Sequence, residues 1–488
     1  MPGSSTPVLQ PVPTGPITRI AVAPVTNFRS SATSTSAAEL ADVLAGTSER
    51  YASLELVRRD SAAILKAAGL SPPADAARLI LVGNPRKLTR DLAAHRNRIA
   101  IIRADDVTPA VRALAWGDVA LFGETRVVKL RDWPLQANLH APSNPYLPAY
   151  DPATAWTLVA GGDILLDRGV AKTVKVDGRG VDFPFGGGTA QIQSRFCCSS
   201  FGWDLPRARR TGDSGAVRQL LRGADLAIAN FENPAPDNFR YHTSGTVFSA
   251  DPRLIDGLKH AGIDYVSLAN NHIRDAGGQG ILDTIDNLDA RGIAHSGAGR
   301  NVAAARKPAI FKRGGIKVAI LGYDTIARYY AATVTGPGSA QLSVAVVRKD
   351  VAAARRAGAD VVIVFPHWGT EYDPTPFAGQ QRLAHACIDA GADLVIGNHA
   401  HWAGAVEVYK GRPIWYALGN FVFDQTWSEP TMEGITLELT FQRAKLVQVR
   451  MRPHIILDKA QPNFMDPSGS GRVVMGQIFD ASKRLLPW

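Results

Sequence analysis

Short runs of apolar residues alternate with amphipathic segments of helical period through most of the 488-residue chain. Runs such as TLVA, LAIA, YVSLA, KVAIL, VVIVF and LVI have the length and the apolar character of buried strands. Between them, residues 215–222, 278–291 and 344–357 have the apolar spacing of helices that cover one face of a sheet. Strands that alternate with helices predict a layered α/β fold.

Changes in this pattern divide the chain into parts. The N-terminus is rich in Pro, Ser and Thr, which is typical of a flexible tether, and a later Pro- and Asn-rich segment predicts a linker. Near the C-terminus, alternating apolar and polar residues predict an antiparallel hairpin at a sheet edge, followed by a helix. The predicted parts are a tether (1–16), an α/β accessory domain (17–130), a linker (131–153), a main domain (154–430) and a β-hairpin and helix extension (431–488).

The predicted accessory domain carries no cluster of chemistry-bearing residues. Its strand and helix patterns alternate, and they include a strand over 98–107 that leads into a helix over 108–115. The sequence of this part has neither a glycine-rich phosphate loop nor a group of histidines and carboxylates. A binding or docking role and a purely structural role both stay open for it.

In the main domain, polar residues follow directly on five predicted strands. Because open α/β sheets gather their ligand sites at the carboxyl ends of the strands, we expect these side chains to converge. They are two carboxylates, an amide and four histidines: Asp163, Glu232, Asn271, His272, His367, His399 and His401. A single histidine is usually an ordinary turn residue, but three at strand ends, two of them in a His-Ala-His sequence, favour a metal site.

This set of donors predicts a catalytic metal centre. Nitrogen and oxygen ligands without thiolates suit zinc, manganese, iron or nickel. Catalytic zinc sites use about three protein ligands, and this set holds more. It therefore predicts two divalent ions that share a bridging carboxylate, as in two-metal hydrolases with ions about 3.5–4 Å apart. Glu371, Asn420 and Asp424 lie near the strand ends and are either ordinary polar residues or groups that support the ligands from outside, and Arg168 is either a substrate anchor or a surface arginine.

Charge favours an anionic partner. The chain carries 54 Lys+Arg against 44 Asp+Glu, a net charge of +10. Residues 171–222 hold nine Lys or Arg and four Asp, which predicts either a solvated basic loop or contact with an anionic polymer. No basic helix or aromatic-basic surface motif points to nucleic acid. No window approaches the roughly 20 apolar residues of a membrane span, and membrane-associated partners stay open.

The cysteines and the N-terminus leave the cellular compartment open. Cys197, Cys198 and Cys387 do not make a disulfide framework. The N-terminus lacks the basic-then-apolar pattern of a secretory signal. The sequence fits a cytoplasmic protein, or a protein of the cell envelope whose leader was removed, and it leaves the oligomeric state undetermined.

The motifs of the main domain occur in an order that resembles one known family. GGD, NFE, ANNH, HWG, GNHAH and LGNFVFD follow one another over about residues 155–430. This order is similar to that of the CapA family, which is associated with capsule and poly-γ-glutamate synthesis and belongs to the calcineurin-like metallophosphoesterase superfamily. The resemblance implies a layered β-sandwich flanked by helices. The phrase ADDVTPAVRALAWGD also resembles a segment related to periplasmic binding proteins that precedes some CapA domains.

The same resemblance implies a role for each strand-end residue. Its metal ligands are Asp163, the bridging carboxylate Glu232, Asn271, His367, His399 and His401. His272 falls on the histidine that lies beside the substrate as an acid. Leu165 departs from the superfamily, whose first motif usually has a histidine there, although CapA-like proteins commonly lack it too.

Two functions are compatible with these observations. The first is a CapA-like, metal-dependent hydrolase or transferase that makes or turns over an envelope polymer, such as poly-γ-glutamate or capsule. A phosphoester and an amide are both open as the bond attacked. The second is a non-catalytic polymer-binding or assembly protein on the same fold, which the missing histidine at Leu165 and the basic insertion favour.

Overall fold

The computed structural model describes residues 16–141 and 149–485, so the predicted tether lies outside the described residues except for its last position. The chain forms two compact units, Met1–Ala153 and Thr154–Trp488. Each has its own sheets, and each is described by itself.

The N-terminal unit is built on one mixed sheet with the strand order β4-β3-β5-β1-β6, to which β8 adds beside β1. The strands are β1 (Ile17–Asn27), β3 (Ser53–Val57), β4 (Leu79–Val82), β5 (Arg98–Arg103), β6 (Val111–Ala113) and β8 (Gln136–His140), and the helices are α1 (Ala37–Ala45), α2 (Ser61–Ala67) and α3 (Pro85–Ala94). A short parallel pair, β2 (Ser34–Thr35) and β7 (Ala115–Trp116), completes the unit.

Two segments of this unit differ from the sequence-based prediction. The helix predicted over 108–115 is wrong, because β6 occupies the middle of that range and pairs antiparallel with β1. Its three residues are buried, so partners distant in sequence outweigh the local helical pattern. In the range assigned to a linker, β8 pairs with β1 over five residues, so this part of the range belongs to the sheet.

The larger sheet of the C-terminal unit has ten strands in the order β11-β10-β26-β25-β24-β9-β12-β13-β14, with β23 beside β9. The strands are β9 (Ala155–Ile164), β10 (Thr189–Phe196), β11 (Leu205–Gly212), β12 (Leu226–Phe231), β13 (Tyr265–Ser267), β14 (Ala294–Ser296), β23 (Asn420–Val422), β24 (Glu433–Gln442), β25 (Lys445–Leu457) and β26 (Gln461–Phe464). Strands β9, β12, β13 and β14 run parallel to one another.

The second sheet of this unit has six strands in the order β16-β17-β19-β20-β22-β21. The strands are β16 (Ala309–Arg313), β17 (Ile316–Asp324), β19 (Val361–His367), β20 (Leu394–Ile396), β21 (Val406–Tyr409) and β22 (Arg412–Trp415). A two-stranded piece, β15 (Ala298–Gly299) with β18 (Gly338–Ser339), lies outside both sheets. Strands β17, β19, β20 and β22 are parallel, so their carboxyl ends share one edge.

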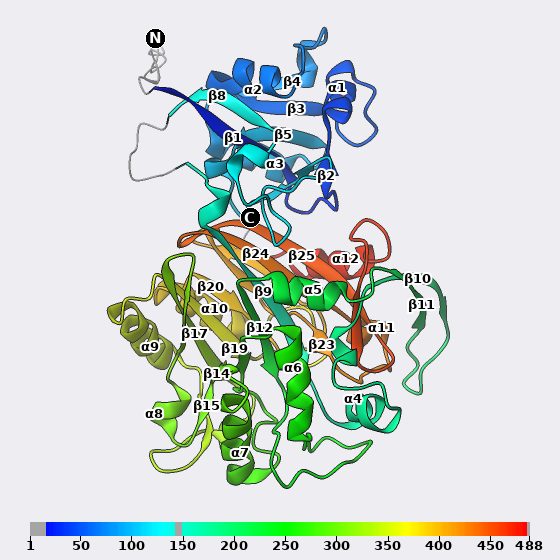
Figure 1. Cartoon of the computed structure of the whole chain (residues 1–488), viewed down its shortest axis with the longest axis vertical. Coiled ribbons are helices and arrows are strands. Elements are labelled where there is room, and N and C mark those ends of the chain that lie inside the picture. The colour runs from blue at the N-terminus through cyan, green and yellow to red at the C-terminus, as the bar shows by residue number, and fades with distance from the viewer. Residues whose placement is uncertain (1–15, 142–148, 486–488) are drawn as a thin grey trace, which may run out of the picture. The chain divides into compact units, whose positions relative to one another are not determined.

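Helices cover the outer faces of both sheets. The helices are α4 (Arg168–Ala171), α5 (Ala216–Gly223), α6 (Ile255–Ala261), α7 (Gly277–Asp289), α8 (Val302–Ala305), α9 (Val344–Arg356), α10 (Ala378–Asp389), α11 (Glu429–Met432) and α12 (Arg472–Ala481). The apolar sides of α5, α6 and α7 pack in one core cluster with strands of the larger sheet, and those of α9 and α10 pack in another with the second sheet. Figure 1 shows where these helices lie.

The inner faces of the two sheets contact each other. Tyr265 of β13 meets Phe365 of β19 with ring centroids 6.2 Å apart. Ser296 of β14 donates from Oγ to the carbonyl of Ile320 on β17 (3.3 Å). This arrangement of helices, sheet, sheet and helices confirms the predicted layered α/β fold with a β-sandwich flanked by helices.

The predicted C-terminal hairpin exists, but its place at a sheet edge is wrong. β24 and β25 pair antiparallel as expected, yet β24 also pairs with β9 over six residues. The hairpin therefore lies inside the larger sheet, whose far edge is the hairpin β10–β11 from the basic insertion. Both strands of β24–β25 are largely buried, as strands inside a sheet are.

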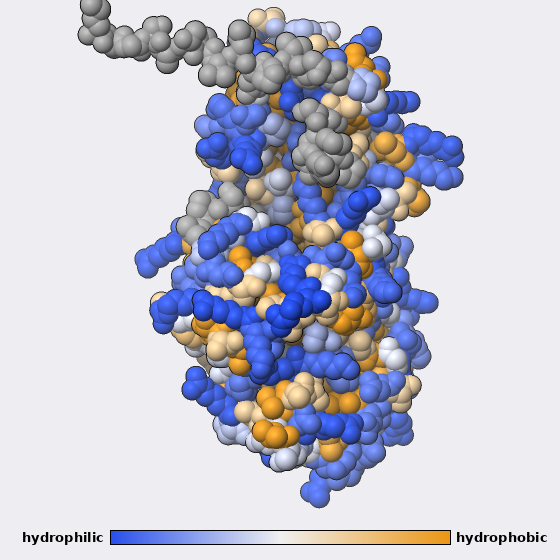
Figure 2. Space-filling view, turned by 90° about the vertical axis from the view of Figure 1, so that its left-hand side faces the viewer, coloured by the Kyte–Doolittle hydropathy of each residue, from blue (hydrophilic) through white to orange (hydrophobic). Residues whose placement is uncertain are grey.

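The surface of the molecule carries mostly hydrophilic residues on the face shown in Figure 2, with small hydrophobic patches between them. Among the described residues, no helix has the length and apolar character needed to cross a membrane.

Candidate metal centre

All seven strand-end residues lie where the carboxyl ends of strands from both sheets meet. Asp163 belongs to the end of β9, Glu232 follows β12, and Asn271 and His272 follow β13. His367 ends β19, and the loop after β20 carries His399 and His401. Five of them are buried: Asp163, Glu232, His367, His399 and His401.

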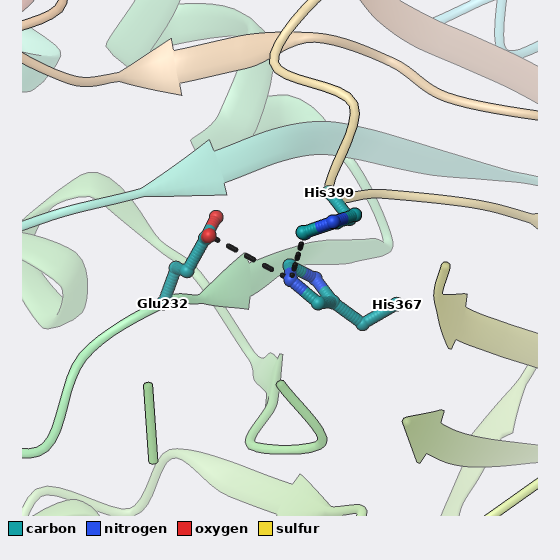
Figure 3. A group of neighbouring side chains, drawn as sticks. All are labelled: Glu232, His367 and His399. Atoms are coloured by element: carbon teal, nitrogen blue, oxygen red, sulfur yellow. Dashed lines mark hydrogen bonds and ion pairs between the residues drawn. The ribbon is translucent and has the colours of Figure 1, made fainter. Parts of the chain in front are cut away.

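Glu232, His367 and His399 form one group of potential ligands, and their side chains point toward one another in Figure 3. His367 Nε2 lies 3.6 Å from Glu232 Oε1 and 3.1 Å from His399 Nδ1. The same nitrogen lies 2.7 Å from the amide oxygen Oδ1 of Asn271. Four predicted ligands therefore bring donor atoms close to one point.

Asp163, Glu232 and His401 form a second group. His401 Nδ1 lies 3.8 Å from Asp163 Oδ2, and His401 Nε2 lies 3.9 Å from Glu232 Oε1. In each group the potential ligand atoms lie within 4.8 Å of one another. Because Glu232 belongs to both groups, it occupies the position that a carboxylate bridging two ions would need.

The Glu232 carboxylate is fully buried. Neither of its oxygens has a hydrogen bond within the described part of the chain, 16–141 and 149–485. Burial raises the pKa of Glu232 well above its ordinary value, and the neighbouring Asp163 raises it further. A buried, unpaired carboxylate costs several kcal/mol, and a cation held between the two groups would offset that cost. The residues present therefore fit a divalent metal.

Burial also sets the charge of the surrounding groups. It raises the pKa of Asp163 to about 7, although hydrogen bonds from Asn230 and from the backbone of His399 oppose the shift. It lowers the pKa of His399 to about 3 and that of His401 to about 4. Burial also lowers the pKa of His367 well below its ordinary value, and the neighbouring histidines lower it further. The imidazoles are therefore neutral at pH 7, the form in which histidine binds metals.

Polar residues behind the ligands fix their orientation. Asn420 accepts from His401 Nδ1 through Oδ1 (2.9 Å), while its amide nitrogen donates to Gln425 Oε1 and to the carbonyl of Thr431. His401 therefore presents Nε2 as an unprotonated nitrogen toward Glu232. Asn420 thus contacts a predicted ligand, as expected for a supporting residue.

A second amide supports two other ligands. Asn230 donates to Asp163 Oδ1 (2.7 Å), and the same amide nitrogen lies 3.2 Å from His367 Nδ1.

The backbone around the site requires close approach and positive φ angles. His399 has φ 95° and His401 has φ 57°, which L-residues rarely adopt and which cost about 1–3 kcal/mol each. Gly162, just before Asp163, has no room for a side chain, because a Cβ there would lie 1.8 Å from the carbonyl oxygen of Gly419. These features hold the GGD, GNHAH and LGN motifs against one another.

His272 lies beside this centre with its ring held in place. Its Nδ1 lies 2.8 Å from Asp275 Oδ2, and its ring stacks on Phe248 with centroids 4.0 Å apart. Asp275 also accepts from the backbone N–H of Phe248 and from the hydroxyl of Tyr330. Asp275 was not singled out in the sequence, although its position three residues after His272 in a turn was an available signal.

Arg168 is engaged by other residues. Its Nη2 forms an ion pair with Asp424 Oδ1 (2.5 Å), and its Nη1 donates to the carbonyl of Gly245 (2.8 Å). Its guanidinium lies over Phe248, 4.8 Å from the ring centroid, on the residue that also stacks with His272. Arg168 is therefore near the candidate acid, but two of its nitrogens already have partners.

Aromatic residues form a rim beside the second ligand group. Tyr372 stacks on His401 (5.8 Å between centroids) and packs edge-on against Trp427 (4.8 Å). The connection between β10 and β11 adds Phe201, which meets Trp427, and Trp203, which meets Trp402. Phe201 is 69% exposed. Contacts between residues so far apart along the chain leave no local signal in the sequence. Glu371, next to Tyr372, is exposed.

The position of the missing histidine is filled with apolar side chains. Leu165 is fully buried in a small cluster with Phe248, Phe423 and Ile456. This packing offers no ligand from residue 165, so the Asp163 side of the centre depends on Asp163, Glu232 and His401.

Comparison with known proteins identifies similar sequences over this unit. Residues 157–425 match the family described as bacterial capsule synthesis protein PGA_cap. The capsule biosynthesis protein CapA of Bacillus anthracis is 36% identical over 220 residues, which make up 43% of this chain and 54% of that protein. A probable polyglutamine synthesis accessory protein of Mycobacterium tuberculosis (strain CDC 1551 / Oshkosh) is 30% identical over 293 residues, 55% of this chain and 74% of that protein.

The chain spans about half the length of the Bacillus relatives it matches, 54% for the protein above and 57% for the PGA biosynthesis protein CapA of Bacillus subtilis (strain 168). Among solved structures, the 5'-nucleotidase precursor from Thermus thermophilus is 15% identical with a TM-score of 0.35, covering 67% of this chain and 58% of that chain. That score is too low to support a conclusion about fold or function.

Proposed function

Because the chain belongs to the bacterial capsule synthesis protein PGA_cap family, we propose that it is a metal-dependent hydrolase or transferase acting on an anionic envelope polymer. Poly-γ-glutamate or a capsule polymer is the proposed substrate class. The names of the Bacillus and Mycobacterium relatives, with their roles in capsule, PGA and polyglutamine synthesis, support this choice. The net charge of +10 suits an anionic substrate.

One observation carries the proposal. Glu232 is a fully buried carboxylate without a hydrogen-bond partner within the described residues, and two groups of potential ligands share it. A carboxylate in this position supports the binding of two divalent ions. Nitrogen and oxygen donors without thiolates favour manganese, zinc or iron. Divalent ions held here would supply a Lewis acid and a hydroxide nucleophile at neutral pH.

The residues around the centre divide the remaining work. Asp163, Glu232, Asn271 and the three ligand histidines would hold the ions, with Asn420 orienting His401. Asp275 fixes the ring of His272 through Nδ1, which leaves Nε2 to give a proton to the leaving group. Arg168, tied to Asp424, positions the wall beside His272 and offers its charge to an anionic substrate.

The experiment that tests this function measures metal content and turnover on one preparation. The purified chain is loaded with Mn²⁺ or Zn²⁺, its metal is quantified by elemental analysis, and generic phosphodiesters, phosphomonoesters and poly-γ-glutamate are assayed. We expect bound metal, and turnover of at least one substrate that His367→Ala abolishes. The matched control is His95→Ala, which removes an exposed histidine of the N-terminal unit. Absence of bound metal, or equal turnover in both variants, would reject the enzyme.

A second function is favoured by the packing at Leu165. The apolar cluster there leaves the centre without the donor that the superfamily usually has at this position, which supports a non-catalytic protein that binds or assembles the same polymer. Polymer retention that survives both metal removal and His272→Ala, without turnover of any substrate, would favour this function. Metal-dependent turnover would exclude it.

A further inference from the structure

A cavity of about 520 Å³ opens in the C-terminal unit beside the basic insertion. Three arginines, one carboxylate and two amides face it: Arg179, Arg210, Arg218, Asp182, Gln461 and Asn463. None of the predicted metal ligands lines this cavity, so within the described residues it is separate from the candidate metal centre.

The arginines are positioned by neighbours but keep unused hydrogen-bonding capacity. Arg210 donates from Nε to Gln461 Oε1 and from Nη2 to Asp458 Oδ2, both at 2.9 Å. Arg218 donates from Nη2 to the carbonyl of Asp182 (2.8 Å), while its buried Nε has no partner among the described residues. Arg179 stacks over Phe183 at 4.1 Å, and its Nη2 lies 3.9 Å from Asp458, too far for a hydrogen bond. Arg218 Nη1 also lies 3.9 Å from Asp182 Oδ2, so the three arginines share two nearby carboxylates, Asp182 and Asp458. The cavity therefore presents fixed arginines with a net positive charge, and the long 3.9 Å pairs of Arg179 and Arg218 leave them able to bind a further carboxylate.

The backbone around the cavity is held by close contacts of the glycine run 186–188. A Cβ at Gly187 would lie 1.7 Å from the carbonyl oxygen of Pro462, and one at Gly188 would lie 2.4 Å from that of Gly212. Gly188 also donates its N–H to Asn463 Oδ1 (3.1 Å). The glycines bring three chain segments together, so the cavity has a defined wall.

One structural element joins this cavity to the aromatic rim of the metal centre. The hairpin β10–β11 begins at the cavity, which Gly188 and Gly212 line, and its far end carries Phe201 and Trp203. These two rings pack on Trp427 and Trp402 of the rim. Eight residues at about 3.3 Å each span about 26 Å, so a polymer could reach both places and a single acidic residue could not.

We propose that the cavity is a carboxylate-binding subsite for an anionic polymer chain whose reacting part lies at the metal centre. This inference rests on the proposed function for its choice of a polycarboxylate. Arg179 and Arg218 would bind polymer carboxylates through charge-assisted hydrogen bonds, and the hairpin would set the distance between the subsite and the centre. Three of the nine basic residues in 171–222 line this subsite.

The test compares two double variants of equal charge. In the first, Arg179→Gln and Arg218→Gln remove two charges from the cavity. In the matched control, Arg207→Gln and Arg209→Gln remove two exposed charges from the other face of β11, one position out of phase with Arg210. Binding of fluorescent poly-γ-glutamate long enough to span the hairpin, and of a γ-glutamate dipeptide, is measured by anisotropy on the full chain.

We expect the cavity variant to bind the long polymer at least about tenfold more weakly and with a shallower salt dependence. The control should change the affinity less than about threefold, as screened surface charges do, and binding of the dipeptide should be alike in all three proteins. Equal losses in both variants, no loss in either, or no binding of the long polymer to the wild type would overturn the subsite.

Repeating the titration with Glu232→Gln separates this inference from the proposed function. If the cavity substitutions still weaken polymer binding in the Glu232→Gln background, the subsite is supported even when no turnover is found. If the cavity variant turns over the polymer as fast as the wild type does, the subsite is rejected but the proposed enzymatic function is not.

Discussion

Asp60 of the N-terminal unit and Glu232 of the C-terminal unit are both buried carboxylates, but their charges are compensated in opposite ways. In the N-terminal unit, Asp60 accepts two hydrogen bonds from Arg103, from Nε at 3.0 Å and from Nη2 at 2.8 Å, and both side chains are almost fully buried. In the C-terminal unit, Glu232 is equally buried and has no such partner among the described residues.

The difference is between a charge that the chain compensates itself and a carboxylate that has no hydrogen-bond partner among the described residues. Burying an ion costs several kcal/mol unless another group compensates it. Arg103 supplies that compensation within the chain, so Asp60 needs nothing from outside. Glu232 has no such compensation among the described residues, and under the proposed function a divalent cation would supply it. A buried carboxylate without a partner is thus a better guide to a site than a buried carboxylate alone.

The largest expected effect comes from Glu232→Gln, which removes the shared ligand while keeping its volume. Metal content should fall below one ion per chain, and turnover should drop by about a thousandfold or more, the scale of losing a group that stabilises charge. In metal-free protein the same variant should melt at an equal or higher temperature, because the cost of burying an ionisable carboxyl group without a partner is gone. Elemental analysis, kinetics and calorimetry in chelator measure these three quantities. A lower melting temperature without metal would break the contrast with Asp60.

Asp60→Asn should have the opposite effect on stability. Breaking the pair leaves Arg103 buried without its counter-charge, which costs about 3–5 kcal/mol. Chemical denaturation measures the loss, and metal content should stay at the wild-type level. An unchanged denaturation midpoint would show that Asp60 is not a structural charge.

The charge of Glu55 of β3 is compensated less well than that of Asp60 and better than that of Glu232. Its titration predicts that the free energy of unfolding depends on pH. Its Oε2 is 3.4 Å from Arg98 Nη1, and burial, with help from Asp91, raises its pKa from 4.5 to about 7. Between these two pKa values, Glu55 is ionised in the unfolded chain but still protonated in the folded chain. The free energy of unfolding therefore falls as the pH rises. Glu55→Gln should remove this slope and stabilise the protein by about 3 kcal/mol at pH 8, with no gain at pH 4. Denaturation at both pH values checks it, and an equal effect at each would contradict it.

The smallest effect is expected for Asn420→Ala, which removes an orienting partner rather than a ligand. His401 would lose the hydrogen bond that fixes its tautomer, and metal affinity should weaken by about 10–100-fold. Competition with a metal-binding dye measures the affinity. An affinity loss as large as that of Glu232→Gln would mean that Asn420 acts as a ligand itself.

The sequence predicted the strands and the residues at their ends well, because both depend on short-range patterns. Apolar runs indicate β9, β12, β13, β19 and β20, and the polar residue that follows each run is visible without knowing its neighbours. The seven residues named at these ends all meet at one edge of the fold, as the parallel arrangement requires.

Contacts between distant segments were beyond the sequence. The helix predicted over 108–115 is instead the strand β6, since β1 offers it a pairing edge. The C-terminal hairpin shows the same limit, because its local pattern does not encode that β24 pairs with β9. Within the site, Asn230 and Asp275 support the predicted ligand and acid through hydrogen bonds that depend on the folded geometry.

The backbone angle at His399 decides how this residue can be removed. At φ 95° an alanine keeps the strain of the histidine, whereas glycine adopts the angle readily. His399→Gly is therefore the truncation that preserves the loop and leaves an imidazole-sized vacancy within reach of Glu232 and His367. Free imidazole that diffuses into that vacancy would replace the missing side chain and restore metal binding. Metal binding by this variant would then be controlled by an added small molecule.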